Sequence, residues 1–364
     1  MSAHEILIVV MAAFAAIGAI DRIFGNRLGL GKPFEEGILS MGTLALAMLG
    51  IISLAPVLAT LLNPVVVPVY RFLGADPAMF AGTILACDMG GGSLAMQMSS
   101  DPDAALLGGV LCGSMLGATI VFTIPVAMGI LREEDRPAMA KGILAGIVTI
   151  PAGVLVGGLV AGFPLTMVLM NLIPIVLIGI LITVGLIFAE KAMIKGFSIF
   201  GKGVVIVITI GLGAAIVEEL TGLALIPGMA PLGEGFATVG AIAIVLAGAF
   251  PLVHVLTRLL RKPLMALGRL LGINESAAGG LLATLANSIA TFERVKDMDD
   301  RGKVVNIAFA VSAAFVFGDH MGFTAGFAPQ MLPAMIVGKL VGGISAVAVA
   351  LLLTKSSRNV AADN

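Results

Sequence analysis

Nine apolar runs, each about long enough to cross a bilayer, divide this chain of 364 residues. They lie near residues 5–24, 37–62, 104–130, 142–162, 165–189, 203–222, 236–258, 304–328 and 332–354. A membrane-spanning helix needs about 20 predominantly apolar residues. Charged residues make up only 12% of the chain and its mean hydropathy is +1.11, whereas soluble domains carry roughly a quarter charged residues. We therefore expect an all-α polytopic membrane protein embedded in a lipid bilayer.

The remaining composition gives no sign of a nucleic-acid partner, a cofactor or a metal centre. The net charge is −1, and no basic patch is interleaved with aromatic residues. Cys87 and Cys112 both lie in apolar segments and are expected to be packing residues. His4 and His254 are too scattered to form a metal site. The N-terminus lacks the basic region and cleavage site of a signal peptide, so we expect a retained first helix.

Two further apolar segments, near 78–99 and 276–293, are polar at their centres. The first contains ACDMGGG (86–92) and the second ATLANSIATF (283–292). Two short amphipathic pieces, 64–74 and 262–272, are too short to span and are expected to lie in the membrane interface.

The distribution of lysine and arginine predicts how the two polar-centred segments are arranged. Basic residues cluster in the loops 22–32, 132–141, 191–202, 258–269 and 294–303 and at the C-terminus. Such loops are usually cytoplasmic. They all fall on one side only if 78–99 and 276–293 enter and leave the membrane on the same face. We therefore expect two re-entrant hairpins, an outside N-terminus and a cytoplasmic C-terminus.

Comparison of the chain with itself at a shift of 198 residues indicates an internal repeat. The matches include Gly37 with Gly235, Gly42 with Gly240, Gly50 with Gly248, Arg71 with Arg269, Asp101 with Asp299 and Lys141 with Lys339. We expect a first repeat over 1–162, a connecting helix within 163–198 and a second repeat over 199–364. Each repeat would hold four transmembrane helices and one hairpin. Four crossings and a connecting helix place the repeats in opposite orientations, as in secondary transporters with a midplane site between interrupted helices.

The first hairpin carries the clearest candidate binding residue, Asp88. A charge at bilayer depth costs at least about 2.5–3.5 kcal/mol and needs a reason. Asp88 is expected near mid-membrane, either capping the helix broken at Gly90 and Gly91 or serving as counter-ion for a cationic substrate. The nearby hydroxyl of Ser93 is a candidate partner for a substrate hydroxyl.

The second half supplies the other candidates. Asn287 lies one position from the equivalent of Asp88, and its amide suits either a substrate hydroxyl or unpaired backbone groups. Thr291 offers a hydroxyl in the same hairpin. Asp319 and His320 are adjacent and form either a structural pair or a proton-responsive element.

Several long strings resemble one known family. FEEGILSMGTLALAMLG (34–50), MFAGTILACDMGG (79–91), GSMLGATIVFTIPVAMGI (113–130) and AFAVSAAFVFGDHMGF (308–323) are similar to the ethanolamine permeases of bacterial ethanolamine-utilisation operons, the EutH family. The resemblance runs nearly from end to end. It implies a protein of the bacterial inner membrane that imports ethanolamine, and not an enzyme. We expect a homo-oligomer, with a dimer favoured.

The chemistry of the candidate residues agrees with such a substrate. Ethanolamine is mostly a primary ammonium ion at neutral pH and needs a carboxylate and a partner for its hydroxyl. The chain has no tryptophan for a cage around a quaternary amine, which favours a primary amine over choline. Two alternatives remain open: a channel-like amine or ammonium facilitator, and an intramembrane enzyme using Asp88 and Asp319 as a dyad.

The topology predicts which loops a membrane-impermeant thiol reagent reaches from outside. In a chain whose Cys87 and Cys112 are replaced by alanine, we expect a cysteine at Lys296 to be labelled only after the cells are permeabilised. A cysteine at Ala224, in a loop without basic residues, is the control and should be labelled in intact cells. Strong labelling at position 296 from outside would contradict both the hairpins and the inverted repeat.

Overall fold

The computed structural model describes residues 2–354, which are helical apart from short connections and contain no strand. The first half of the chain forms α1 (Ala3–Ile23), α2 (Gly31–Phe72), α3 (Ala78–Ile84), η1 (Cys87–Met89), α4 (Gly91–Met98), α5 (Pro102–Leu106), η2 (Leu107–Gly117), η3 (Thr119–Thr123), α6 (Ile124–Ile130), η4 (Glu133–Asp135) and α7 (Arg136–Val160). The second half forms α8 (Leu165–Thr221), α9 (Leu232–Leu271), α10 (Glu275–Ala286), α11 (Ser288–Phe292), η5 (Val295–Asp297), α12 (Asp300–Ala313), α13 (Asp319–Phe327), η6 (Pro329–Met331) and α14 (Leu332–Leu353). The C-terminus that we expect in the cytoplasm, residues 355–364, lies outside the described residues.

Seven of the helical stretches in the described part are long and apolar enough to span a bilayer. These seven stretches differ in two places from the nine apolar runs predicted from the sequence. The runs 165–189 and 203–222 both fall in the continuous helical stretch α8, in which two helices meet at a kink at Ala189, where φ is −144° and ψ is 41°. The run 304–328 is interrupted between α12 and α13. The basic segment 191–202 is therefore helical and not a loop, and the molecule is a multi-pass membrane protein.

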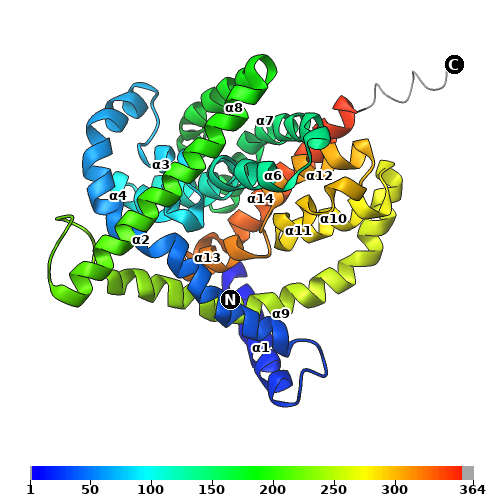
Figure 1. Cartoon of the computed structure of the whole chain (residues 1–364), viewed down its shortest axis with the longest axis horizontal. Coiled ribbons are helices and arrows are strands. Elements are labelled where there is room, and N and C mark those ends of the chain that lie inside the picture. The colour runs from blue at the N-terminus through cyan, green and yellow to red at the C-terminus, as the bar shows by residue number, and fades with distance from the viewer. Residues whose placement is uncertain (1, 355–364) are drawn as a thin grey trace.

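The prediction of separate interfacial pieces at 64–74 and 262–272 is wrong. Each piece continues a longer helix, because α2 runs for 42 residues and α9 for 40. Proline removes one helical hydrogen bond and favours a kink, yet α2 and α9 continue through their internal prolines. α9 accommodates this by curving around one side of the molecule (Figure 1).

Helices at corresponding places in the two halves pack against each other. α2 lies against α9, and α7 lies against α14. The α7–α14 approach brings backbones together: a Cβ on Gly153 would lie 2.7 Å from the Gly338 carbonyl oxygen, and one on Gly338 would lie 2.8 Å from that of Gly153. Small residues of this kind allow close packing in membranes, where no hydrophobic force drives helices together.

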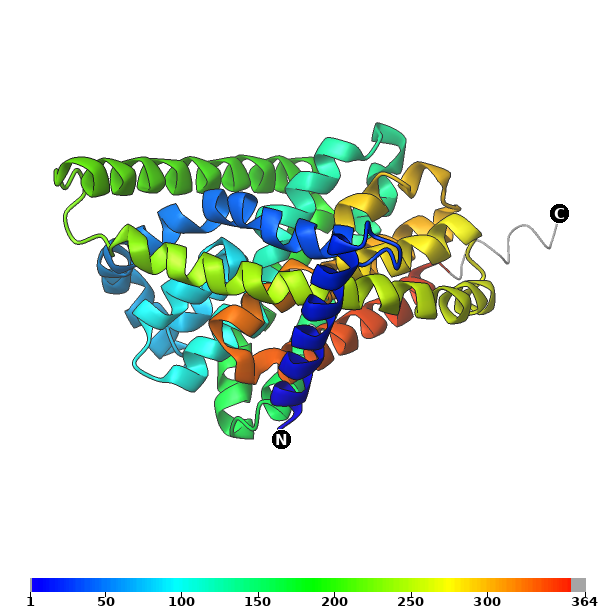
Figure 2. The ribbon, with the colours of Figure 1, turned by 90° about the horizontal axis from the view of Figure 1, so that it is seen from below.

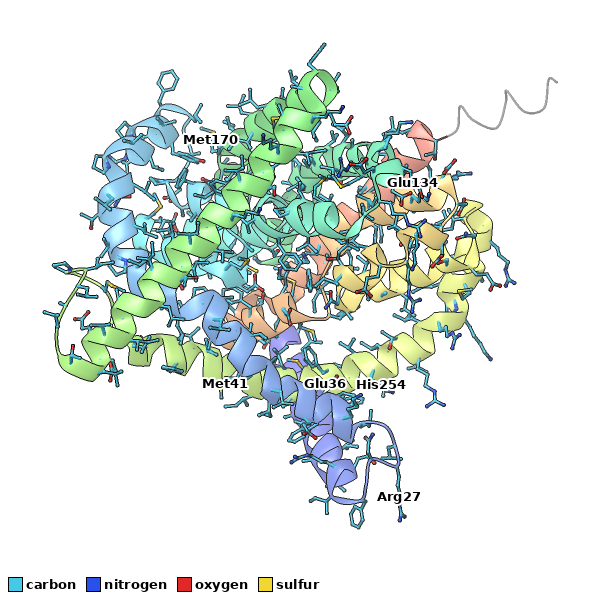
Figure 3. All side chains as sticks on the ribbon, viewed as in Figure 1. Arg27, Glu36, Met41, Glu134, Met170 and His254 are labelled. Carbon is cyan, nitrogen blue, oxygen red and sulfur yellow. The ribbon has the colours of Figure 1, made fainter. Side chains whose placement is uncertain are left out.

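The outer surface of the molecule is apolar. Large side chains such as Phe72, Phe188 and Leu270 are 83–90% exposed, as expected for residues that face lipid. The second part of α8 lies along one edge of the molecule (Figure 2) and packs against α2. Charged side chains such as Arg27 and Glu134 lie at the periphery (Figure 3).

Interrupted helices meet in the interior. The arms α3 and α4 of the first hairpin pack against each other and against η2. The segments η2 and η3 are π-helical, and every residue of η2 is buried. π-Helical turns occur frequently at functional sites. In the second half, the link between α12 and α13 is tied to the end of α10, because Phe315 and Phe317 donate backbone hydrogen bonds to the carbonyls of Thr284 and Leu285 at 3.1 and 2.8 Å.

Two glycines that the repeat pairs with each other mark close helix crossings. A Cβ on Gly50 of α2 would meet the Ile208 carbonyl of α8, and a Cβ on Gly248 of α9 would meet the Met11 carbonyl of α1. We therefore expect Gly50→Ala and Gly248→Ala each to destabilise the protein by about 1–3 kcal/mol, the usual cost of overpacking.

Thermal unfolding of the detergent-purified variants measures this effect. Gly42→Ala, at an exposed position of the same helix, is the matched control because no atom beyond its own helix backbone and chain neighbours lies within 4 Å of the added carbon. It should be neutral or stabilising, since alanine favours helix by up to about 1 kcal/mol. Equal melting temperatures for the Gly42 and Gly50 variants would contradict the close crossing.

Candidate functional site

Asp88 lies where the first hairpin turns. α3 ends at Ile84, and Leu85 and Ala86 adopt extended backbone conformations before the single 3₁₀ turn that holds Asp88. The Ala86 carbonyl accepts hydrogen bonds from the N–H groups of Met89 and Gly91 at 3.0 and 2.9 Å, which closes the turn. Gly90 has φ +93°, a left-handed conformation that glycine adopts without strain. The turn therefore depends on the glycine that follows the aspartate.

The Asp88 carboxylate has few partners within the protein. Its side chain is 16% exposed and lies 3.7 Å from Nε2 of His320 and 4.0 Å from the thiol of Cys87. Among the described residues, no lysine or arginine nitrogen lies within 4.0 Å of it. It does not cap α4, which has no side-chain cap hydrogen bond. The geometry therefore disfavours a capping role and leaves a carboxylate free to meet a cation.

A cavity of about 790 Å³ opens beside Asp88. Small-molecule sites commonly occupy roughly 300–1,000 Å³ and are mostly apolar with a few polar groups. The lining residues come from both halves of the chain: Thr43, Leu44, Ala47, Ala86, Asp88, Met89, Ala118, Val121, Phe122, Pro125, Val126, Ser198, Gly201, Lys202, Val205, Ile206, Phe315, Asp319 and His320. The cavity thus places the carboxylates of Asp88 and Asp319 beside one mostly apolar space.

Aromatic rings form one wall of this cavity. The Phe315 ring centroid lies 5.4 Å from that of Phe122 and 5.3 Å from that of His320. Phe315 has φ +62°, which is a strained conformation for a bulky residue and is often associated with functional sites. Benzene faces attract cations, although more weakly than indole faces. The wall therefore suits a small organic cation held by Asp88.

His320 pairs differently from the sequence prediction. Its nearest charged partner is Asp88 of the first half and not the adjacent Asp319. Its Nδ1 atom is buried and has no hydrogen-bond partner among the described residues. The imidazole therefore links the two halves at the cavity, and it remains a candidate proton-responsive group.

Three other candidates lie away from the cavity. Asn287 is exposed, and its Oδ1 accepts a hydrogen bond from the Ile289 N–H at 2.8 Å, which caps α11. Thr291 is fully buried and donates to the Gly280 carbonyl at 2.9 Å. Ser93 is partly buried on α4 and is not among the lining residues. The structure therefore brings together Asp88, Asp319 and His320, with Gly90 and Gly91 forming the turn that holds the first of them.

Four polar residues at or near the site were not among the predicted site residues. Thr43, Ser198 and Lys202 line the cavity. Lys339 of α14 is 0% exposed and donates to the Ser114 carbonyl at 2.5 Å. Its sequence signal was a lone lysine inside the apolar run 332–354. In the repeat alignment it matched Lys141, which hid its unusual position.

Cys87, Asp88 and His320 bring three potential metal-ligand atoms within 4.8 Å of one another. A structural zinc site usually has four protein ligands, and a catalytic site keeps an open position for chemistry. The Cys87 thiol is fully buried, and the other two groups already face each other. We therefore assign no metal to this group.

Comparison with known proteins identifies the family. The family described as "Ethanolamine utilisation protein, EutH" matches residues 3–353. The chain belongs to the EutH family. It is 62% identical to the "Probable ethanolamine permease EutH" of Listeria monocytogenes, with 97% of this chain and 95% of the relative covered. It is 48% identical to the protein of the same name from Salmonella typhimurium, with 97% and 96% covered, and 51% identical to YxeR of Bacillus subtilis, also with 97% and 96% covered. No solved structure matches the chain significantly.

The contact between His320 and Asp88 predicts a pH effect on this EutH-family member. Once protonated, His320 would compete with any cationic ligand for Asp88, so ligand affinity should fall as the pH decreases. We expect His320→Gln to make affinity for a cationic ligand less dependent on pH than it is in the unaltered protein.

The control is His254→Gln, because His254 lies on α9 near the outer surface (Figure 3) and is exposed. It should keep the pH profile of the unaltered protein. If His320→Gln instead lowers the amount of folded protein and leaves the pH profile intact, the histidine is structural.

Proposed function

We propose that this protein is a permease that imports ethanolamine across the bacterial cytoplasmic membrane and binds it as ethanolammonium at Asp88. The observation that carries the proposal is the Asp88 carboxylate, which lies at a helix break beside a cavity and has no lysine or arginine nitrogen within 4.0 Å among the described residues. The names of the Listeria and Salmonella relatives support the same substrate and a transport role.

The groups around the cavity suit this ligand. The ammonium group of ethanolamine carries three N–H donors and one positive charge, which a carboxylate and aromatic faces stabilise. Asp88 provides the charge, and the rings of Phe122 and Phe315 provide the apolar wall. The substrate hydroxyl has candidate partners in Asp319, Thr43 and Ser198, which line the same cavity.

A two-fold relation between the halves supports transport by alternating access. Gly37 of α2 lies against Ala247 of α9, and a Cβ there would be 2.5 Å from the Ala247 nitrogen. The position 198 residues after Gly37 is Gly235, and it lies against Leu49, which is 198 residues before Ala247. The contact is therefore reciprocal, as a pseudo-two-fold axis between α2 and α9 requires.

The direction of these helices indicates where the axis lies. Residue numbers rise along α2 while the contacting numbers fall along α9, so the helices are antiparallel. A two-fold axis relating an antiparallel pair runs across the helices. For helices that cross a membrane, such an axis lies in the membrane plane and relates inverted repeats, 1–162 and 199–364, joined by a connecting segment within 163–198. Transporters built from inverted repeats bind substrate between them and expose the site to each side in turn.

The cavity fits this arrangement because its walls come from both proposed repeats. Asp88 belongs to the first repeat, whereas Asp319 and His320 belong to the second. A movement of one repeat against the other would open the same carboxylate to either side of the membrane.

We expect Asp88→Asn to insert and fold normally but to bind ethanolamine about ten- to a hundred-fold more weakly. A charge-assisted hydrogen bond contributes about 1.5–3 kcal/mol, which corresponds to that range of affinity. Asparagine keeps the shape of the side chain and removes its charge. Calorimetry on the purified protein and uptake of labelled ethanolamine into proteoliposomes measure the effect, with choline and ammonium as competitors.

Asp101→Asn is the matched control, because Asp101 caps α5 at an exposed loop. It should retain wild-type affinity. Unchanged affinity in Asp88→Asn would place the cation site elsewhere, with Asp319 the next candidate. Uptake that does not saturate, together with conduction of ammonium, would indicate a channel-like facilitator in place of a permease.

A further inference from the structure

Lys339 is a buried cation that the proposed binding mode does not use. It lies on α14, its side chain is 0% exposed, and its Nζ donates to the backbone carbonyl of Ser114 at 2.5 Å. No carboxylate oxygen of the described residues lies within 4.0 Å of Nζ. Ionisable side chains inside membrane proteins are rare and costly, and they commonly mark substrate or proton pathways. A packing role alone would be met by leucine or methionine.

The charged surroundings of Lys339 are those of the candidate site. The contact with Ser114 places Lys339 beside the turn that holds Asp88, because a Cβ on the neighbouring Gly113 would lie 3.1 Å from the backbone nitrogen of Cys87. His320 of α13 lies 3.7 Å from Asp88 in the same region. The π-helical segment η2 contributes only the carbonyl of Ser114. Lys339 is therefore a buried positive charge beside the turn that carries Asp88, whose carboxylate also has Cys87 and His320 next to it.

Asp88 and Lys339 differ in their access to the cavity. Asp88 lines the cavity, whereas Lys339 is enclosed and is not among the lining residues. A ligand in the cavity therefore meets Asp88 directly, while Lys339 acts on the same carboxylate from within the protein. Two cations that share one carboxylate in a medium of low polarity oppose each other.

We propose that Lys339 is a proton-exchanging residue, whose ammonium balances Asp88 in the empty protein and gives up its proton when ethanolammonium binds. This inference rests on the proposed role of Asp88 as the counter-ion. In the step, one N–H bond of the Lys339 ammonium breaks, its electron pair stays on Nζ, and the proton passes to water in the cavity. Ethanolammonium keeps its own proton and replaces Lys339 as the partner of Asp88. The site carries the same net charge before and after binding.

The geometry offers a path for that proton. The imidazole of His320 lines the cavity and lies 3.7 Å from Asp88. A histidine can accept a proton on one ring nitrogen and release one from the other. In a transport cycle, one ethanolammonium ion would enter as one proton leaves, so that the cycle moves no net charge.

Proton release on binding is the first test. Calorimetric titration of the purified protein with ethanolamine, in two buffers of different ionisation enthalpy, counts protons released per ligand bound. We expect about one proton to be released per ethanolammonium bound near neutral pH. Binding with no proton release would overturn the proposal.

Two substitutions of Lys339 then separate proton exchange from a structural cation. Arginine cannot be deprotonated in a protein, so Lys339→Arg should hold a permanent cation beside Asp88 and weaken ethanolamine binding about tenfold or more. Lys339→Met has no charge to compete and should still bind. If Lys339→Arg binds ethanolamine normally and Lys339→Met does not, the proposal is overturned. Size-exclusion profiles and melting temperatures establish that each variant is folded.

Lys141→Met is the matched control, since it makes the same change at the paired repeat position, where the lysine is exposed. It should leave affinity and proton release unchanged. If Lys339→Arg does not fold, Lys339→Met decides: a folded protein that no longer binds ethanolamine overturns the proposal. The proposed function fails separately, if the unaltered protein does not bind ethanolamine or if Asp88→Asn binds it normally. Binding that needs Asp88 but releases no proton contradicts only the role of Lys339.

Discussion

The need to satisfy every backbone polar group inside a membrane governs this structure. Irregular backbone is tolerated at membrane depth only where it is buried in protein or lines a water-filled cavity. The first break is closed by the Ala86 carbonyl, which accepts two N–H groups. The second joins two segments, since the link after α12 donates to the carbonyls of Thr284 and Leu285 at the end of α10. The helix breaks are therefore tolerated because their backbone groups are bonded within the protein, beside the cavity.

The same constraint explains the distribution of charge. An unpaired carboxylate is costly in a low-dielectric interior, so Asp88 is best accommodated at the edge of a cavity, where water or a ligand reaches it. His320 lies 3.7 Å from this carboxylate, and the buried Lys339 bonds to Ser114, next to the glycine that packs against the turn. The first hairpin thus carries a charge that the fold does not neutralise by direct contact, whereas the second hairpin satisfies its own polar groups through Asn287 and Thr291.

The helical class, the broken segment around Asp88 and the family were predictable from composition, from the position of the glycines and from long matching strings. The continuity of α2 and α9 was not predicted, because the short amphipathic pieces 64–74 and 262–272 suggested separate segments, whereas both helices continue through them. The break before Asp319 had no strong local signal, since it is held by hydrogen bonds to a distant hairpin. The partner of His320 and the burial of Lys339 depend on how the two halves meet, which a linear pattern does not contain.

The proposed repeats differ in the chemistry of their corresponding positions. Position 88 corresponds to Ala286 at a shift of 198 residues, and Asp319 corresponds to Val121. The carboxylate of Asp88 thus comes from one half, while the imidazole of His320 and the buried ammonium of Lys339 come from the other. Any movement of one half against the other changes the distances between these charges. Electrostatic energy varies with such distances most strongly in a medium of low dielectric constant. A conformational change that exposes the site to the opposite side of the membrane would therefore also alter the affinity of Asp88 for a cation, which couples access to release.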